Sequence, residues 1–346
     1  MSGRTTPGPG VPEGLSRDTF SQFAEPYRQE LKLHCYRMLG SLQDAEDVVQ
    51  ETFVKAWNAL DEFEGRALFR NWLYRIATNA CLNALTSRSR RGRLLPQQLA
   101  GPSSELPQGQ PDSDVPWLQP YPDFELERIV DSSAGPERRY EMRETVRLAF
   151  MAAIQELPPR QRAALLLSDV IGWSAQEIAA LLGGSIVSVN SALQRARGTM
   201  QSLYRSAAPS LRTVRDHDHS ELLDRYVRAW ESTDLDAFVN LLKEDATYSM
   251  PPWRQWYHGR DAIRWFFSNV WKSYGGFRLL PAHANDQPAF GLYTRANAAD
   301  GWNAHSLQVL SLQEDRIAAL TVFMKPLTAM LFPAFRLPLA LVEAAP

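Results

Sequence analysis

The stretch SLQDAEDVVQETFVKAWNALDEFEGRALFRNWLYRIATNACLNALTSRSRRGR, residues 41–93, contains two helical patterns in succession. In the first, apolar residues recur every three or four positions, which is the period of a helix with one buried face and not that of a strand. These apolar residues are Ala45, Val48, Val49, Phe53, Ala56, Trp57 and Leu60. Ser41, with Asp44 three positions later, resembles a capping box at the start of this helix. We therefore expect an amphipathic helix that buries its apolar stripe.

The opposite face of this helix is acidic and polar, and the second pattern ends in arginines. The acidic face carries Asp44, Asp47, Gln50, Glu51 and Lys55. The second helix has its apolar residues at Phe69, Trp72, Leu73, Ile76, Ala77, Ala80, Cys81 and Ala84, its polar face at Arg75, Asn79, Asn83 and Thr86, and then Arg88, Arg90, Arg91 and Arg93. An acidic face followed by an amide-rich face that ends in arginines indicates two partners, one basic and one polyanionic.

In their order and spacing, the runs DAEDVVQETFVKAW and FRNWLYRIATNACLNAL resemble region 2 of the extracytoplasmic-function (ECF, group 4) sigma factors of bacterial RNA polymerase. In that family, the first helix docks on the clamp-helix coiled coil of the largest polymerase subunit, and the following loop and helix melt and hold the minus-ten promoter element. The resemblance implies contacts with core polymerase at Asp44, Asp47, Gln50 and Glu51. It implies contacts with promoter DNA at Arg66, Asn79, Asn83 and Arg88.

Composition sets wider limits. A chain of 346 residues is long enough for two or three domains, and 45% hydrophobic with 22% charged residues is ordinary for a soluble globular protein. A formal net charge of -2 argues against a uniformly basic nucleic-acid binder, so any DNA affinity must be local. Cys35 and Cys81 both fall on apolar helical stripes, which favours buried thiols over a disulfide or a metal pair.

The chain shows no pattern of a secreted or membrane-bound protein. It opens without a signal peptide, and no apolar run approaches the roughly 20 residues that span a bilayer. We therefore expect a cytoplasmic protein that makes no membrane contact. We expect neither a cofactor nor a metal site, since His34, on an apolar helical stripe, has no second ligand at metal spacing.

Residues 1–15 are rich in glycine and proline and are expected to be a disordered lead-in, and residues 16–93 form a compact three-helix domain in which Gly40 ends the first helix. Residues 94–135 are rich in proline, serine and acids and are predicted to be a linker. Its second half also carries Trp117, Leu118, Tyr121, Phe124 and Leu126. Two interpretations stay open. The aromatic residues dock on a neighbouring domain of the same chain, or, as in sigma factors, the segment threads the polymerase active-centre and RNA-exit channels while its acids mimic RNA phosphates.

Residues 136–210 are predicted to start with Pro136 at a helix N1 position, continue as a helix to Leu157, and then form a helix-turn-helix. The first of its two helices buries Ile178, Ala179 and Leu182, Gly183 and Gly184 make the turn, and the second buries Val189, Leu193 and Ala196. The DNA-facing residues are then Ser185, Ser188, Asn190, Ser191, Gln194 and Arg195, with Arg197 as a further phosphate contact. The segment resembles sigma region 4, the reader of the minus-thirty-five element, but has Asn190 and Ala192 where such helices often carry arginines.

Residues 216–325 read as helices followed by a curled antiparallel sheet, with strand runs at 277–284, 289–295, 305–313 and 316–323. Element order and the DATY and GRDAI runs resemble the SnoaL-like cone fold. Its candidate ligand pocket is lined by Tyr248, Trp253, Trp256, Tyr257, His258, His283 and His305, with Asn285 beside them. No residue stands out as a catalytic base, so a non-catalytic regulatory domain is expected. The apolar tail, residues 326–346, is too broken by prolines to span a membrane and is expected to pack on the cone or on the sigma domains.

The chain is thus predicted to be multidomain, with two all-α sigma domains and an α+β SnoaL-like cone. The resemblance implies a sigma factor that binds core RNA polymerase and promoter DNA, in which the cone replaces a separate anti-sigma protein and binds a small-molecule ligand. One alternative is an isomerase or hydrolase with its active site in the cone. Another is a helix-turn-helix repressor, which would have no reason to present the acidic face from Asp44 to Glu51.

Overall fold

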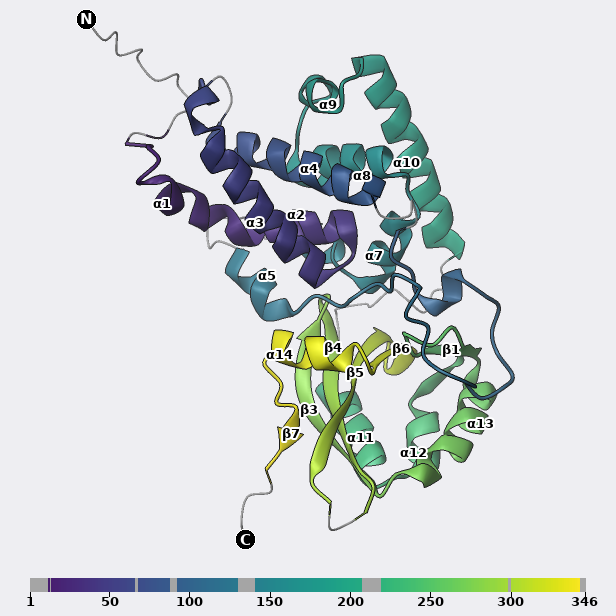
Figure 1. The fold of residues 1–346 in the computed structure, drawn as a ribbon. Coiled ribbons are helices and arrows are strands. Elements are labelled where there is room, and N and C mark those ends of the chain that lie inside the picture. The colour runs from purple at the N-terminus through teal and green to yellow at the C-terminus, as the bar shows by residue number, and fades with distance from the viewer. Residues whose placement is uncertain are drawn as a thin grey trace, which may run out of the picture. The chain divides into compact units, whose positions relative to one another are not determined.

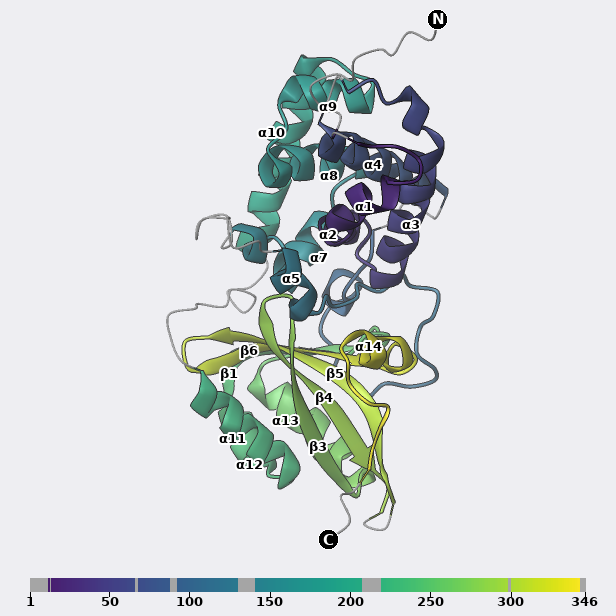
Figure 2. The same cartoon turned by 90° about the vertical axis from the view of Figure 1, so that its left-hand side faces the viewer.

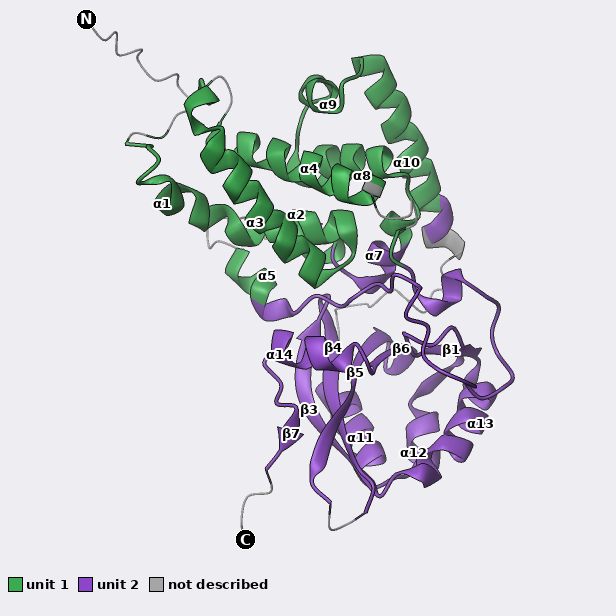
Figure 3. Cartoon of the chain, viewed as in Figure 1, with its two compact units in different colours: residues 1–93, 125–145, 153–201 green, residues 94–124, 146–152, 202–346 purple. Residues whose placement is uncertain are grey.

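The computed structural model (Figure 1) describes residues 12, 14–65, 68–87, 92–129, 141–206, 219–297 and 300–342. The chain divides into two compact units, coloured green and purple in Figure 3. The first unit is Met1–Arg93, Glu125–Thr145 and Ala153–Gln201, and the second is Leu94–Phe124, Val146–Ala152 and Ser202–Pro346. The described part of the first unit is helical, and the second contains a sheet with its own helices. The predicted combination of helical segments followed by an α+β domain is confirmed.

The first unit begins with helices whose boundaries follow from their caps. They are α1 (Phe20–Ala24), the 3₁₀ turn η1 (Glu25–Tyr27), α2 (Arg28–Leu39), α3 (Leu42–Asn58), the 3₁₀ turn η2 (Leu60–Glu62) and α4 (Phe69–Ser87). Gly40 ends α2 with a φ of 68°, a left-handed conformation that glycine adopts without steric cost. Ser41 then caps α3, because its hydroxyl accepts a hydrogen bond from the Asp44 N–H at 3.2 Å. Both boundaries agree with the sequence.

Two residues of the predicted apolar stripe of α3 are not fully buried, because Phe53 is half-buried and Trp57 is exposed. Trp57 is 42% exposed, and the guanidinium of Arg17 lies 5.0 Å from its ring centroid. Thr52 takes a place in the buried stripe instead, with its hydroxyl donating to the Val48 carbonyl at 2.7 Å. The helical rotation of about 100° per residue keeps positions 45, 49, 52 and 56 on one side and carries position 57 outward.

Among the described residues, two histidines have a lowered pKa: His34, which is fully buried, and His305, which is half-buried. Nε2 of His34 lies 2.9 Å from a threonine hydroxyl of α4, and its Nδ1 has no hydrogen-bond partner within the described chain. Burial, followed by the charges of Arg37 and Arg70, lowers the pKa of His34 to about 3. Burial and the charge of Lys325 lower the pKa of His305 to about 4. Both imidazoles are therefore neutral in the folded chain at neutral pH.

We expect the stability of the folded chain to fall as the pH drops from about 6.5, the pKa of an unfolded histidine, toward the folded values. The unfolded chain binds protons in this window and the folded chain does not, so acid favours unfolding by up to about 1.4 kcal/mol per histidine and pH unit. Urea denaturation of the wild type and of His34→Asn at about pH 7 and about pH 5 measures the effect. The variant should lose less stability over this interval, and an equal loss in both would contradict the assignment.

The helices that follow are α5 (Asp123–Ile129), α7 (Leu148–Gln155), α8 (Pro159–Leu165), the π-helical turn η4 (Leu166–Ile171), α9 (Ala175–Leu182) and α10 (Ile186–Ser206). Ser174 and Glu177 form a capping box at the start of α9. Gly183, with a φ of 64°, ends it. The helix-turn-helix predicted from this stretch is confirmed, with α10 as its second, recognition helix.

The predicted long helix after residue 136 is interrupted. Residues 145–147 form a turn, and α7 starts only at Leu148. The side chain of Asn285 donates to the Val146 carbonyl at 2.6 Å, so this backbone group bonds outside the helix. A local sequence pattern does not contain that competing partner. Pro136, the predicted N1 residue, lies outside the described residues.

The second unit is built on a sheet of order β2-β1-β6-β5-β4-β3, with β7 paired to β5. The strands are β1 (Leu242–Ser249), β2 (Trp256–His258), β3 (Gly276–Ala284), β4 (Gln287–Arg295), β5 (Trp302–Gln313), β6 (Arg316–Met324) and β7 (Ala340–Leu341). The helices are α11 (Ser220–Glu231), α12 (Leu235–Asn240), α13 (Arg260–Val270), the 3₁₀ turn η6 (Trp271–Ser273) and α14 (Thr328–Ala334). Figure 2 shows α11 to α13 on one side of the sheet and α14 on the other. The four predicted strand runs are confirmed, although β1 pairs with β6 in parallel rather than antiparallel.

Aromatic side chains fill the space between the sheet and α11 to α13. The rings of Tyr226, Trp230, Phe238, Phe267 and Trp271 are buried, with neighbouring centroids 4.9 to 6.1 Å apart. Burial of each such ring contributes roughly 1.5–3 kcal/mol, and the edge-to-face contacts among them add to this. The interior that a cone fold can use for a ligand is therefore occupied by the protein's own side chains at these positions.

The apolar C-terminal tail packs on the other face of the sheet. Leu331 and Phe332 of α14 are fully buried, and the Phe332 ring lies 5.3 Å from that of Tyr293. Side chains alternate along a strand, so Tyr293 of β4 faces away from the aromatic interior that Leu292 enters. The strand β7 then extends the sheet at β5. Of the two surfaces expected for the tail, the cone and the sigma domains, the tail packs on the cone.

Candidate functional site

The acidic face of α3 is exposed over three of its four predicted residues. Asp47, Gln50 and Glu51 lie exposed on the helix. Glu51 pairs with the lysine one turn later at 2.5 Å, but both side chains are about half exposed, so the pair is weak and its carboxylate stays accessible. The fourth residue, Asp44, forms an ion pair with Arg93, and both side chains are largely buried. The free acidic face is therefore Asp47, Gln50 and Glu51.

Two apolar side chains extend this face. Val54 is 60% exposed and Trp57 is 42% exposed, each about one or two turns beyond Gln50. Exposed apolar groups beside carboxylates are typical of a surface that meets another protein. Sequence reasoning missed Val54, and the available signal was its spacing from Asp47 and Gln50, which places it on their side of the helix.

The outward side of α4 is rich in amides, as predicted. Asn79 and Asn83 are exposed and one turn apart, and Arg75 lies exposed one turn before them. These groups can hydrogen-bond bases or phosphates. Arg66 and Arg88, the other two predicted contacts of this region, lie outside the described residues.

Three of the residues predicted to face DNA from the helix-turn-helix are engaged elsewhere in the chain. The Ser185 hydroxyl accepts from the Ser188 N–H at 3.1 Å, and the Ser188 hydroxyl accepts from the Ser185 N–H at 3.0 Å. Together they cap α10. Arg197 forms a two-pronged ion pair with Asp169, at 2.7 and 3.1 Å, which raises the pKa of Arg197.

The remaining candidates lie on the outer side of α10. Asn190, Gln194 and Arg195 are exposed, and Ser191 is half-buried. Sequence reasoning missed Val187, which is 74% exposed in the first turn of the same helix. Its spacing from Asn190 and Ser191 was the signal that could have found it.

A buried arginine joins the early and late helices of the first unit. Arg162 of α8 is 1% exposed, and its guanidinium donates to the carbonyls of Met38, Gln155 and Leu157 and to the Gln155 side chain. The Gln155 amide in turn donates to the Arg37 carbonyl at 3.0 Å. Burial lowers the pKa of Arg162 to about 10. One side chain thus satisfies carbonyls of both α2 and the α7–α8 junction.

Residues 94–124 are the part of the predicted linker 94–135 that belongs to the second unit, and they are called the linker from here on. They bond to β2 and to the turn before it. The bonds run from Ser103 N–H to the Trp256 carbonyl (2.7 Å), from Trp256 Nε1 to the Ala100 carbonyl (2.8 Å), from the Tyr257 hydroxyl to the Glu105 carbonyl (2.8 Å), from Asp112 N–H to the Pro252 carbonyl (2.9 Å) and from Arg254 to the Asp112 carboxylate (2.5 Å). Leu106 packs against the aromatic interior, while Trp117, Leu118 and Tyr121 are buried. Of the two interpretations of the linker, docking on a domain of the same chain is the one observed.

The turn between β3 and β4 holds the far end of the linker. Asn285 is fully buried, its side chain accepts from the Tyr121 N–H at 2.8 Å and donates to the Val146 carbonyl at 2.6 Å, and its own N–H donates to the Tyr121 carbonyl at 2.9 Å. The next residue, Asp286, pairs with Arg147 at 3.2 Å, with both side chains 7% exposed. We call Asn285 and Asp286 the hairpin tip. It binds two segments that precede and follow residues 125–145 in the chain.

Four of the seven predicted pocket residues belong to the packed interior or to the linker contact. Tyr248 is buried in the aromatic interior, and Trp253 packs against it. Trp256 and Tyr257 hydrogen-bond the linker, as above. At Trp256 and Tyr257, carbonyl groups of the linker accept the hydrogen bonds that the two side chains donate.

The three predicted pocket histidines differ in their exposure to solvent. His258 and His283 are exposed. His305 is half-buried, and its Nε2 lies 3.0 Å from the Tyr274 hydroxyl. The structure does not bring the three together in one described hollow.

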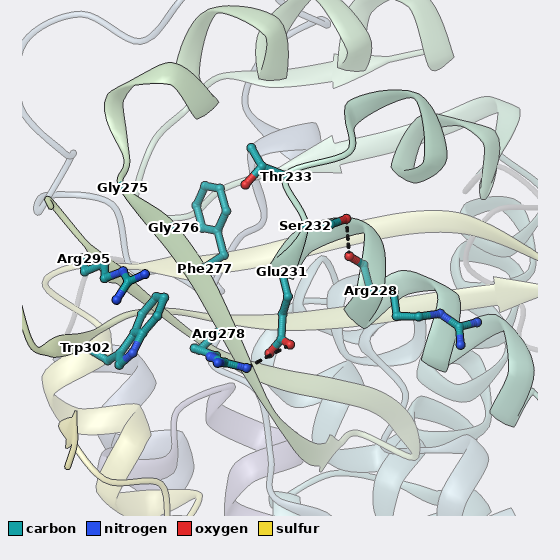
Figure 4. A pocket seen from close by; sticks show the side chains of 10 residues that line it. All are labelled: Arg228, Glu231, Ser232, Thr233, Gly275, Gly276, Phe277, Arg278, Arg295 and Trp302. Atoms are coloured by element: carbon teal, nitrogen blue, oxygen red, sulfur yellow. Dashed lines mark hydrogen bonds and ion pairs between the residues drawn. The ribbon is translucent and has the colours of Figure 1, made fainter. Parts of the chain in front are cut away.

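A hollow of about 600 Å³ opens instead where α11, β3, β4 and β5 meet (Figure 4). It is lined by Arg228, Glu231, Ser232, Thr233, Gly275, Gly276, Phe277, Arg278, Arg295 and Trp302. The guanidiniums of Arg278 and Arg295 lie 5.7 and 4.4 Å from the Trp302 ring centroid, and Glu231 pairs with Arg278 at 3.3 Å. Figure 4 shows Arg228 pointing away from this group. The hollow shares no residue with the seven predicted for a pocket.

In the described ranges, no group of three or more His, Cys, Asp or Glu side chains is arranged to hold a metal ion. None of the helices in the part of the chain that the structure covers is long and apolar enough to cross a bilayer.

An exposed acidic helix face, an amide-lined helix, a helix-turn-helix and an α+β domain that binds the chain's own linker define a multidomain DNA-binding transcription factor. Family models of sigma-70 region 2, sigma-70 region 4 and the SnoaL-like domain match residues 23–91, 147–200 and 223–320. The chain is 44% identical to the ECF RNA polymerase sigma factor SigG of Mycobacterium tuberculosis over 331 residues, which cover 94% of this chain and 86% of that protein. It belongs to the ECF sigma factors of RNA polymerase, with a fused C-terminal SnoaL-like domain, as predicted.

Two other relatives agree with this. The RNA polymerase sigma-H factor of Pseudomonas aeruginosa is 33% identical over 176 residues, covering 51% of this chain and 79% of that one. The crystal structure of the ECF sigma factor SigJ of Mycobacterium tuberculosis has the same fold, with a TM-score of 0.57 and 22% identity over 92% of this chain and 99% of that chain. A sigma-factor fold implies binding to core RNA polymerase and to promoter DNA.

Proposed function

We propose that this sigma factor binds core polymerase through Asp47, Gln50 and Glu51 and reads promoter DNA through α4 and α10. Its SnoaL-like domain regulates it by binding the linker and so keeping the linker away from the polymerase. In sigma factors, the segment between regions 2 and 4 threads the polymerase channels. Here the same segment is bonded to β2 and to the hairpin tip. A linker held in this way is not available to the polymerase, so the bound form has low activity and release of the linker raises it.

The single observation that carries this proposal is the set of linker contacts with β2. They include main-chain bonds, a charge-assisted bond from Arg254 to Asp112 and the buried aromatic side chains of the linker. Tethering within one chain gives such contacts an effective concentration of order millimolar, so individually weak bonds can hold the segment. In this bound form, Arg254 neutralises the carboxylate of Asp112.

The enzyme alternative receives no support from the site. The rings of the cone interior fill it, and of the candidate histidines two are exposed and one is half-buried. We therefore propose a non-enzymatic factor acting in the cytoplasm. Binding of a small-molecule ligand by the C-terminal domain stays a prediction. Among the described residues, the seven candidates do not line one cavity.

The test of the proposed function is polymerase binding by a chain with a reversed α3 face. Asp47→Lys with Glu51→Lys should abolish co-purification with core polymerase and transcription in vitro, because both carboxylates are exposed and face away from the helix core. The fold should be unchanged, since neither side chain is buried. The matched control is Asp61→Lys with Glu62→Lys in the neighbouring η2 turn, which should retain binding.

Retained polymerase binding by the α3 variant would contradict the assigned surface. Loss of binding by both double variants would show a general effect of charge rather than a specific contact.

A further inference from the structure

The recognition helix α10 presents one outward stripe with an apolar residue at its start. Positions 187, 190, 191, 194 and 195 each lie three or four residues from at least one other member of the set, so they share a face of the helix. Val189, Leu193 and Ala196 are buried on the opposite face. The outward stripe is polar except for Val187, which is 74% exposed.

The first turn of α10 offers apolar rather than polar groups to a partner. The hydroxyls of Ser185 and Ser188 are taken up by the cap described above. The two side chains between them are Ile186, 48% exposed, and Val187. A β-branched residue has a lower helix propensity than most straight-chain residues, so helix propensity alone does not favour valine at this exposed position. Contact with a partner would bury it.

The major groove of B-DNA has one apolar feature, the C5 methyl group of thymine. We propose that Val187 contacts a thymine methyl in the upstream promoter element and is a specificity-determining residue, an inference that rests on the proposed function. Ser185 and Ser188 position the helix turn that carries Val187. The polar members of the stripe, Asn190 and Arg195 among them, bond base edges or phosphates beyond it. Continuity with these groups on one face favours DNA over a protein as the partner of Val187.

The test uses the full chain bound to core polymerase and the double-stranded DNA that this complex selects from a randomised pool. Each thymine of the selected upstream element is replaced in turn by deoxyuridine, which removes only the methyl group. One replacement should weaken binding about fourfold, the change in affinity that corresponds to the burial of one methyl group. The other replacements should have no effect. In Val187→Ala the thymine DNA should bind more weakly, and the deoxyuridine penalty should disappear. Val342→Ala, an equally conservative change at an exposed valine of the C-terminal tail, should keep the penalty.

A deoxyuridine penalty of equal size in the wild type and in Val187→Ala would overturn the proposal, as would a selected element that contains no thymine. Reduced transcription by Val187→Ala without any change in DNA binding would assign the side chain to a protein partner and also overturn it. A complex that forms but selects no DNA contradicts the proposed function itself, which separates that failure from the failure of this inference.

Discussion

Replacement of Arg162 by alanine is expected to lower the free energy of unfolding of the first unit by about 3–5 kcal/mol. The arginine is fully buried and donates to three carbonyls and one amide oxygen, so its removal leaves acceptors on Met38, Gln155 and Leu157 without a donor in a site closed to water. A loss of this size is a large fraction of the 5–15 kcal/mol that stabilises an ordinary domain.

Native-state hydrogen exchange of α2 and α8 measures this loss separately from the sheet of the second unit. Arg162→Lys keeps the charge and some of the donors and should fall between the wild type and Arg162→Ala. Arg160→Ala is the matched control, because this exposed arginine lies two residues earlier on the same helix and bonds only the Leu182 carbonyl in the described chain. If Arg162→Ala costs no more than Arg160→Ala, the network does not stabilise the unit.

Substitution of Asn285 by glycine is expected to loosen the end of the linker by about 2–4 kcal/mol, since the Tyr121 N–H and the Val146 carbonyl lose their buried partners. That corresponds to roughly 30- to 1000-fold faster hydrogen exchange at residues 117–124. Transcription with core polymerase should rise at the same time, because the segment becomes available to the polymerase. Glycine is the informative substitution because Asn285 has a φ of 56°, a left-handed conformation in which alanine would be strained and glycine is not.

Glu314→Gly controls for the loss of a side chain in a turn of the same sheet. Glu314 has a φ of 53° and lies in the exposed turn between β5 and β6. Its replacement by glycine should change neither the hydrogen exchange at residues 117–124 nor the transcription. Faster hydrogen exchange in Asn285→Gly without any rise in transcription would show that binding of the linker by the SnoaL-like domain does not limit transcription.

The sequence was sufficient for features whose signals are local. Gly40 and Ser41 mark a helix end and a helix start by their conformational and capping preferences, and the helix-turn-helix follows from a periodic apolar pattern on each side of Gly183. The strand runs are similarly visible from alternation and turn residues. Trp57 was misplaced because an apolar side chain near the end of a stripe does not by itself say whether it turns inward.

The contacts that govern the linker could not be predicted because they join distant parts of the chain. The side chain of Asn285 bonds residues that are 164 and 139 positions away. Nothing near Asn285 in the sequence identifies Tyr121 or Val146 as its partners. The same long-range bonds explain why the helix predicted from Pro136 is interrupted before Leu148. The candidate pocket failed to assemble for a related reason, since β2 is used to bind the linker.

The contact between Asp112 and Arg254 has an evolutionary consequence. If, as proposed, the linker alternates between its own domain and the polymerase, it is under selection from two surfaces, of which only one is encoded in the same gene. Changes at Asp112 can be compensated by a change at Arg254 but not by a change in a polymerase that serves every other sigma factor. Among close relatives, substitutions at Arg254 should therefore follow those at Asp112, while the linker itself drifts slowly.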